Sequence, residues 1–174
     1  MGKTVEVRLA SATDLEALVS LATAFHDHIG LSAPSAADFR TAIARLLQDR
    51  DTEFLVAWSA CGGGGLGYVQ SRYRYSAWTM ALEAEIEDVF VRQTARRRGV
   101  GKQLVASAMA RAMAKGCHTI GLNTNERNTG AVALYQHLGF SAAQARWHGG
   151  RQLWLTKVLA PTCVGAITGQ RAAT

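Results

Sequence analysis

Residues 83–140 read EAEIEDVFVRQTARRRGVGKQLVASAMARAMAKGCHTIGLNTNERNTGAVALYQHLGF, and the predicted elements follow one another clearly in this stretch. A strand is predicted over 83–92, and apolar residues at helical spacing predict a long helix over 100–115. A short strand of the buried type follows over 118–124, and a second helix over 128–138. Because a crossover between two strands of one sheet joins parallel strands, the strands on either side of the long helix are predicted to lie parallel.

The residues outside this stretch predict the remaining elements. Alternating apolar and charged residues predict a strand over 5–9, and helical spacing predicts two helices before residue 48. Strands over 53–60 and 66–75 form a hairpin around a glycine-rich turn, and two further strands are predicted at 140–146 and 151–159. The order β-α-α-β-β-β-α-β-α-β-β predicts a mixed α+β (α/β) fold, with a mostly antiparallel mixed sheet of about seven strands and about four helices.

Length and composition are those of one soluble globular domain. The 174 residues are expected to form a single domain over 1–160, followed by a tail over 161–174. Hydrophobic residues make up 48% of the chain and charged residues 18%, which excludes an intrinsically disordered chain. No apolar run has the roughly 18 residues of a membrane span. The three cysteines are widely spaced and no secretory signal is visible, so a cytoplasmic setting is expected.

Charge is distributed unevenly along the chain. Residues 1–88 hold 12 of the 13 acidic residues and 7 of the 19 Lys and Arg, which gives a net charge of −5. Residues 89–174 hold 12 basic residues and one acid, which gives +11. A protein that binds an anionic ligand beside a cationic one would show this pattern, and strong basicity also suggests nucleic acid as a partner.

The short segment Arg96-Arg97-Arg98-Gly99-Val100-Gly101-Lys102 lies between a predicted strand and the long helix. Backbone amides at a glycine-rich helix start have no partner within the helix, and the helix dipole and the basic side chains add positive charge. Glycine at 99 and 101 lets a ligand approach the backbone closely. The segment is therefore suited to hold a phosphate or pyrophosphate, although a solvated basic helix cap explains it equally well on its own.

A second motif, NTGAVALYQHLGF, covers residues 128–140. Together the two segments resemble the GNAT superfamily of acyl-CoA-dependent N-acetyltransferases. The coenzyme motif of that family, Q/R-x-x-G-x-G/A, is matched by Arg96, Gly99 and Gly101. Its downstream motif, N-x-x-A-x-x-L/F-Y-x-x-x-G-F, is matched by Asn128, Ala131, Leu134, Tyr135, Gly139 and Phe140. The resemblance is strong over residues 83–140 and compatible with the rest of the chain.

The resemblance implies acetyl-CoA as co-substrate and requires no metal. The segment from Arg96 to Lys102 would hold the pyrophosphate, and Asn128 would bond the pantetheine arm. The main chain of Val89, Phe90 and Val91 would pair with this arm like an added strand. Tyr135 would protonate the leaving thiolate, a role that suits a phenol because its pKa of about 10 is near that of a thiol. Without the motif, Tyr135 would be read as an aromatic residue whose hydroxyl lies in solvent.

Carboxylates on the strand over 83–92 are candidates for the catalytic base. Glu83, Glu85 and Glu87 alternate, so they are predicted to share one face, with Asp88 on the opposite face. An exposed strand face explains Glu83 and Glu85 equally well, but Glu85 is also predicted to bind the substrate. Glu87 is nearest to the expected thioester, where a carboxylate would deprotonate the amine, through a water molecule.

Residues 67–78 and 86–91 resemble the diamine (spermidine/spermine) acetyltransferase branch, in which a strand rich in tyrosine precedes the motif. This resemblance implies a small, cationic, polyamine-like acceptor, and Tyr73 of the tyrosine-rich strand is predicted to bind it. Asp27 is also predicted to line the acceptor pocket if the first helix ends before it. His26 and His28 flank Asp27, but residues i and i+2 do not face each other on a helix, so no metal site is expected. Because the superfamily often pairs through its last strands, a homodimer is expected.

Other functions remain open at this point. An aminoglycoside-type acetyltransferase also takes a polycation, and the amine of a protein or peptide is a third acceptor. The alternative without an enzyme is a basic nucleic-acid-binding or regulatory module on the same fold, which the charge of the second half favours. The basic residues gather, however, at the one turn that coenzyme phosphates would explain, and they do not alternate with aromatic residues. Nucleic acid and membrane partners are therefore not expected.

Overall fold

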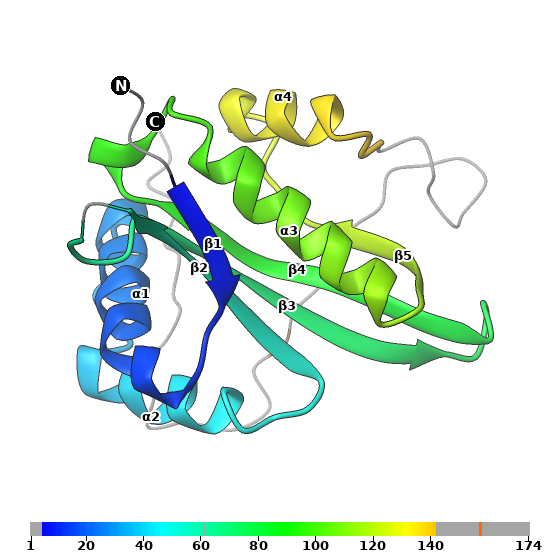
Figure 1. The fold of residues 1–174 in the computed structure, drawn as a ribbon, viewed down its shortest axis with the longest axis horizontal. Coiled ribbons are helices and arrows are strands. Elements are labelled where there is room, and N and C mark those ends of the chain that lie inside the picture. Colours follow the sequence, from blue (N-terminus) through cyan, green and yellow to red (C-terminus); the bar gives the residue numbers. More distant parts are fainter. Residues whose placement is uncertain (1–4, 61, 142–156, 158–174) are drawn as a thin grey trace.

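The computed structural model describes residues 5–60, 62–141 and 157, and these form a five-stranded sheet with helices on both faces (Figure 1). The strands follow the order β1-β2-β3-β4-β5, with bounds Val5–Leu9, Thr52–Ser59, Gly67–Ser76, Ala81–Val91 and Cys117–Leu122. The first three pairs of neighbouring strands are antiparallel and the β4–β5 pair is parallel. The mixed α+β class and the parallel pair are as the sequence predicts.

Two of the predicted strands and the predicted tail cannot be compared with this structure. Of the strand predicted over 151–159 only Lys157 is described, and the tail over 161–174 lies outside the described residues. Only Phe140 and Ser141 of the strand predicted over 140–146 are described, and neither is in a strand. The prediction of a buried strand over 118–124 is wrong for the described part, because β5 is half exposed along its length.

Four helices are described, as the sequence predicts, and cap residues set their ends. Their bounds are Leu15–Ile29 (α1), Ala36–Leu46 (α2), Val100–Ala114 (α3) and Thr129–His137 (α4). Ser35 begins α2 with a capping box, in which its own amide donates to Asp38 Oδ2 at 2.9 Å. Gly30 ends α1 with a left-handed φ of 74°, a conformation that glycine adopts without strain. No helix of the described residues is long and apolar enough to cross a membrane.

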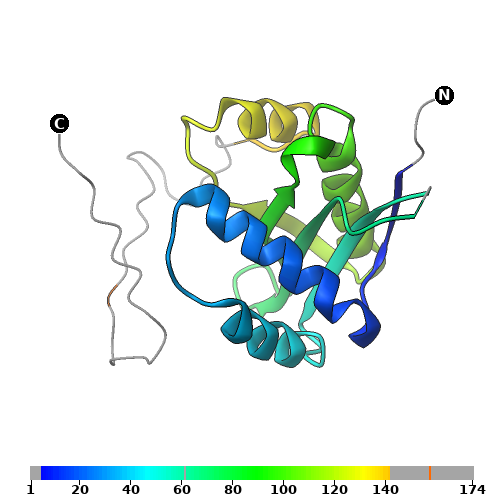
Figure 2. The same ribbon diagram turned by 90° about the vertical axis from the view of Figure 1, so that its left-hand side faces the viewer.

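The core consists of two layers, one on each face of the sheet. Figure 2 shows the helices that cover the two faces. Phe54 and Val56 of β2 pack on the face covered by α1 and α2, together with Leu18 and Phe90. The alternate residues of β2 pack on the face covered by α3, where the fully buried Leu104 lies. Both faces of β2 and β3 are therefore buried, and this rigid centre fixes the position of β4.

A bulge in β4 changes which side chains share a face. Gln70 of β3 pairs with Asp88, and the next residue of β3, Ser71, pairs with Ile86, so Glu87 is an extra residue in β4. The alternation is reset there, and Asp88 lies on the face of α1, where it accepts a hydrogen bond of 3.2 Å from the hydroxyl of Tyr68. The prediction that Asp88 points away from the face of Glu85 and Glu87 is therefore wrong.

Candidate active site

The turn before α3 presents unpaired backbone amides. In the described part of the chain, no hydrogen bond uses the amides from Arg97 to Lys102, and the first satisfied amide of α3 is that of Gln103, which donates to Gly99 O at 3.0 Å. Arg97 and Gly99 both have positive φ, 60° and 79°, which turns successive amides outward. No side chain caps the helix at Gly99. Such an array of amides is the arrangement that binds phosphate groups.

The two glycines of this turn have different roles. A Cβ at Gly99 would meet nothing within 4 Å, so the backbone there faces open space and glycine is required for its φ. A Cβ at Gly101 would lie 3.4 Å from Leu134 of α4 and 3.7 Å from Val91 of β4. The first turn of α3 is therefore packed directly against the end of β4 and against α4.

The edge of β4 is open beside this turn. Pairing between β4 and β5 begins at Leu82 and ends where Ile86 meets Leu122, whereas β4 continues to Val91. The amide of Arg92 donates to Leu66 O on the β3 side, but the carbonyl of Val91 accepts from Arg96 Nε at 3.0 Å. Within the described residues, no strand covers the edge of β4 at residues 89–91, so an extended ligand would be able to pair with the backbone groups there other than the carbonyl of Val91.

Tyr135 lies in α4 and Asn128 at its N-cap, and Tyr135 packs against the same core cluster as Val89 and Val91 of β4. The ring of Tyr135 packs against the core layer beneath α3 and meets Phe140 edge-on, with ring centroids 5.9 Å apart. Its hydroxyl has no hydrogen-bond partner among the described residues, and burial raises the pKa of the phenol. Asn128 caps α4 through its side chain, which accepts from the amide of Ala131 at 3.4 Å.

Charged side chains line a hollow of about 370 Å³ on the β3 and β4 strands. We call it the charged hollow; its lining residues are Asp49, Asp51, Arg72, Tyr73, Arg74, Glu85 and Glu87. Glu87 accepts a hydrogen bond of 2.5 Å from Gln70 Nε2. Burial raises the pKa of Glu87, and the neighbouring Asp88 and Glu85 act in the same direction, against the opposing effect of Arg72. A raised pKa suits a group that must accept a proton near neutral pH.

A second hollow, of about 390 Å³, lies at the other end of β4. Its lining includes Asp27 and His28 from α1, Phe90 from β4 and Arg96 from the turn. The structure thus places Asp27 beside the turn and apart from Glu85 and Glu87. His28 is exposed, whereas His26 is buried and hydrogen-bonds to the carbonyl of Ala33. No group of three or more metal-ligating side chains occurs among the described residues.

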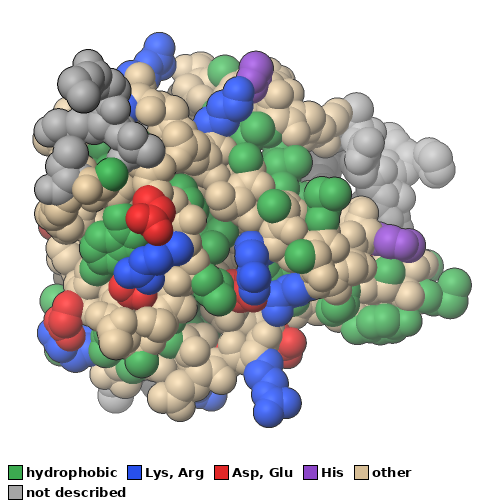
Figure 3. All heavy atoms as spheres, viewed as in Figure 1, with side chains coloured by type: hydrophobic (Ala, Val, Ile, Leu, Met, Phe, Trp, Pro, Cys, Tyr) green, Lys and Arg blue, Asp and Glu red, His purple; other side chains and the backbone are tan. Residues whose placement is uncertain are grey.

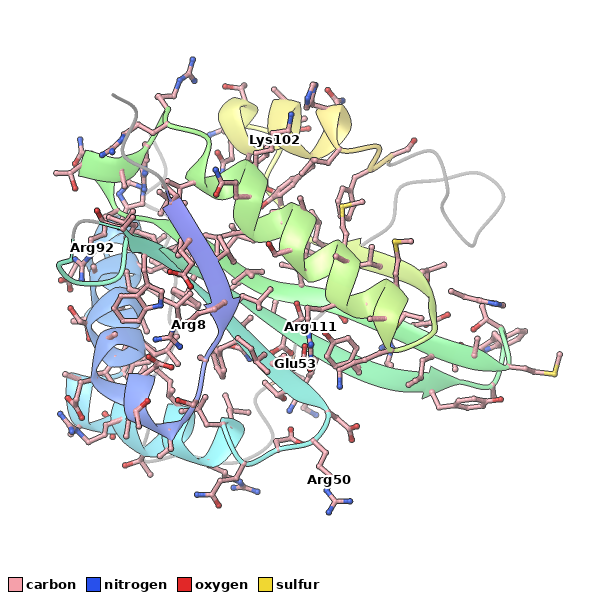
Figure 4. All side chains as sticks on the ribbon, in the orientation of Figure 1. Arg8, Arg50, Glu53, Arg92, Lys102 and Arg111 are labelled. Carbon is pink, nitrogen blue, oxygen red and sulfur yellow. The ribbon has the colours of Figure 1, made fainter. Side chains whose placement is uncertain are left out.

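Tyr73 contributes to the wall of the charged hollow, but its hydroxyl lies with α3. It donates to Glu53 at 2.9 Å, and Arg111 and Lys115 contact the same carboxylate at 2.6 Å and 3.2 Å (Figure 4). Burial alone would raise the pKa of Glu53, but these hydrogen bonds lower it overall. The structure therefore does not bring the phenol of Tyr73 together with Glu87.

Four lining residues of the charged hollow escaped the sequence analysis. Asp49 and Asp51 lie in the loop before β2, and Arg72 and Arg74 alternate along β3. The alternation of the arginines was visible in the sequence, but the register that sets Arg72 opposite Glu85 was not.

Known proteins resemble this chain over part of its length. The sequence model of the Acetyltransferase (GNAT) family matches residues 16–140. The chain is 32% identical over 89 residues to a thialysine N-epsilon-acetyltransferase of Sus scrofa, with 49% of this chain and 51% of that protein covered. It is 36% identical over 59 residues to an aminoglycoside N(6')-acetyltransferase of Salmonella typhimurium, with 34% and 41% covered. The matches span between 20% and 56% of the curated relatives' lengths.

Solved structures show the same fold. An aminoglycoside N-acetyltransferase in complex with CoA has a TM-score of 0.71 at 22% identity, with 90% of this chain and 97% of that chain covered. The family match includes β4, the turn, α3 and α4, which are the elements that form the opening described above. The chain belongs to the GNAT acetyltransferase family.

Proposed function

We propose that this protein transfers an acetyl group from acetyl-CoA directly to a primary amine of a small cationic substrate. The observation that carries this proposal is the order of features along β4. The unpaired amides of Arg97–Lys102 adjoin one end of the strand, its open edge at residues 89–91 follows, and Glu87 lies at the bulge. The pyrophosphate, the pantetheine arm and the reacting amine would thus each lie beside a group suited to bind it, in order along β4.

The residues present fit the coenzyme. The amides from Arg97 to Lys102 hold the pyrophosphate, and the exposed guanidiniums of Arg97 and Arg98 add charge. The open edge of Val89–Val91 pairs with the pantetheine arm as an added strand would, and Asn128 contacts the arm through its free amide nitrogen. Lys102 extends from α3 toward α4, where its Nζ lies 2.9 Å from His137 Nε2 (Figure 4).

The reaction needs a base, an acid and close approach of two reactants. The amine loses a proton to Glu87, directly or through a water molecule, and its nitrogen attacks the thioester carbonyl. The nitrogen adds to the carbonyl to form the C–N bond, and the tetrahedral adduct then expels the thiolate as the C–S bond breaks. The thiolate takes the proton of Tyr135, the second proton of the nitrogen is lost to solvent, and Tyr135 and Glu87 return to their starting states by proton exchange with solvent. A phenol whose pKa is raised by burial keeps that proton until the thiolate forms. Holding both reactants in one cleft supplies much of the acceleration.

The charged hollow supports a cationic acceptor, because four carboxylates line it against two guanidiniums. The named relatives act on several kinds of amine, so an aminoglycoside or the amine of a protein or peptide is the second candidate acceptor. On the face shown in Figure 3, Lys and Arg side chains are scattered among acidic and apolar ones, which favours the enzyme over a nucleic-acid-binding module.

Two measurements test the proposal. Acetyl-CoA in large excess over its Kd is expected to raise the melting temperature, because a ligand at about 100 times its Kd stabilises the folded state by about 2.7 kcal/mol. Release of the CoA thiol is then followed with diamines, amino acids, aminoglycosides and peptides as acceptors. If acetyl-CoA gave no shift while DNA bound tightly at physiological salt, the enzymatic interpretation would be refuted.

A further inference from the structure

The guanidiniums of Arg72 and Arg74 are poorly satisfied within the protein. Arg72 lies 3.7 Å from Glu87 and Arg74 lies 3.7 Å from Glu83, beyond hydrogen-bonding distance. No hydrogen bond of the described residues uses either guanidinium, although Arg8 and Arg111 each bind a carboxylate with two. Both side chains are more than half exposed, at 52% and 69%. They present free forks of N–H donors, whose geometry matches a carboxylate.

These arginines lie between two acidic groups of the charged hollow. Arg72 is opposite Glu85 in the register of β3 and β4 and lies 3.7 Å from Glu87. On its other side, hydrogen bonds from the Asp51 amide and the Thr52 hydroxyl lower the pKa of Asp49, and the charge of Arg72 adds to this effect. Asp49 is held by Thr52 Oγ1 at 2.8 Å, whereas the carboxylate of Asp51 has no hydrogen-bond partner among the described residues. The hollow therefore presents negative, positive and negative charge in succession.

A polyamine does not match this pattern, because it carries only positive charge and would meet both guanidiniums. We propose that the acceptor is an α,ω-diamino acid, with its carboxylate on Arg72 and Arg74, its α-ammonium near Asp51, and its terminal amine at Glu87. This inference rests on the proposed acetyl transfer and specifies the acceptor of the same site.

Because Arg72 is only loosely paired with Glu87, the carboxylate of the bound acceptor also changes the surroundings of Glu87. In the free protein the Arg72 guanidinium stabilises the charged Glu87 and repels an incoming ammonium group. A carboxylate bound to Arg72 competes for that guanidinium and leaves Glu87 to the amine. An acceptor without a carboxylate lacks this effect, so the arginines select against it as well as for the diamino acid.

The test compares L-lysine with analogues that each lack one group: cadaverine lacks the carboxylate, L-lysinamide has it neutralised, and 6-aminohexanoate lacks the α-ammonium. Because hydrogen bonds between charged groups are strong, the kcat/KM of lysine should exceed those of cadaverine and lysinamide by about tenfold or more. Isothermal titration of the protein–CoA complex with the same compounds gives the matching affinities without turnover.

Arg72→Gln should remove the preference for acceptors with a carboxylate by raising KM for lysine and 6-aminohexanoate. The KM for cadaverine should stay the same or fall. Arg50→Gln is the matched control, because it removes the same charge from the adjacent loop at a side chain that points away from the sheet (Figure 4). Rescue by Arg72→Lys should be partial, since lysine keeps the charge but not the fork.

The outcomes separate this inference from the proposed function. Acetylation of cadaverine as efficient as that of lysine would overturn the inference and leave the acetyltransferase intact. Stabilisation by acetyl-CoA without binding or acetylation of lysine would do the same. No stabilisation by acetyl-CoA would remove both. An equal loss of kcat/KM for lysine and cadaverine in the Arg72→Gln variant would mean that Arg72 has only a structural role.

Discussion

At the scale of single residues, Tyr135 is the group that we propose protonates the thiolate, without a large share in coenzyme binding. Tyr135→Phe keeps the ring that packs beneath α3 and against Phe140, so the fold is retained. General acid catalysis contributes about 10²–10⁴-fold, so we expect kcat to fall by about a hundredfold with KM for acetyl-CoA nearly unchanged. Steady-state kinetics measure both, and an unchanged kcat would exclude Tyr135 as the acid.

Glu87 should govern the acidic limb of the pH–rate profile. The base must be deprotonated, so kcat/KM rises as pH rises through the pKa of Glu87, which burial places above the ordinary value for glutamate. Glu87→Gln cannot titrate, and we expect the limb to disappear together with a loss of about a hundredfold in kcat/KM. Glu16→Gln, an exposed carboxylate paired with Arg40, is the control and should keep the limb. A limb that persisted in Glu87→Gln would assign the base to another group.

The residue scale also shows what could be predicted for the site. The amides of the turn were predicted because glycine spacing and helix geometry are local properties that a sequence displays. The face of Asp88 was mispredicted because a single extra residue in β4 reverses the alternation, and only the pairing with β3 reveals it. The role of Arg72 likewise depends on its partner across the strand pair.

At the scale of elements, Gly67 allows β3 to approach β4 closely where β4 extends beyond its pairing with β5. A Cβ at this position would lie 2.4 Å from the carbonyl oxygen of Phe90, which is backbone and unable to move aside alone. We expect Gly67→Ala to destabilise the protein by about 1–3 kcal/mol, the usual cost of overpacking, and to weaken acetyl-CoA binding by displacing residues 89–91.

Gly121→Ala in β5 is the matched control for Gly67→Ala. Its Cβ would meet nothing within 4 Å, so its unfolding curve should remain close to that of the wild type. Chemical unfolding and coenzyme titration of both variants make the comparison. Equal effects at the two glycines would contradict the close approach at Phe90.

The junction of β1 and α1 depends on one carboxylate. Asp14 precedes α1, accepts two hydrogen bonds from Arg8 at 2.8 Å and 2.7 Å, and is only 5% exposed. The hydrogen bond from Arg8 lowers the pKa of Asp14 to about 2 from an ordinary 3.8. At 1.36 kcal/mol per unit, the charged form contributes about 2 kcal/mol to folding at neutral pH.

Asp14→Asn keeps a residue suited to the helix start but loses this charge, so about 2 kcal/mol of stability should be lost at pH 7. Because the unfolded chain takes up its proton at a higher pH than the folded chain, the difference from wild type should shrink as pH falls from about 4 to about 2. Urea unfolding at several pH values measures it. A difference that stayed constant with pH would show that the charge is not the cause.

The elements themselves were largely predictable, because each is bounded by local signals. Ser35 begins α2, and Gly30, Gly116 and Gly139 follow helices with φ of 74°, 79° and 90°. The exposure of β5 was not predictable in the same way. Its apolar residues suggested burial on both faces, but burial depends on what packs against a strand, which is a property of the whole fold.

At the scale of the whole molecule, the two oppositely charged halves of the sequence contribute to different ends of the proposed active site. The basic half supplies the turn before α3, and the acidic half supplies the carboxylates of the charged hollow. In the proposed function, the basic turn at Arg97 and Arg98 attracts the coenzyme, and Asp49 and Asp51 at the charged hollow attract the acceptor. Both attractions act over the Debye length of about 10 Å at 0.1 M salt. Rising ionic strength should therefore raise KM for both substrates, each through its own group of charges.

Paired variants separate the two effects. Replacing Arg97 and Arg98 by glutamine should raise KM for acetyl-CoA at low salt and flatten its dependence on salt, while KM for the acceptor keeps its slope. Replacing Asp49 and Asp51 by asparagine should do the reverse. The measurement is KM for each substrate from low to physiological salt. If either double variant flattened both slopes, the charges would act through the net charge of the protein, and the two ends of β4 would not be separate binding regions.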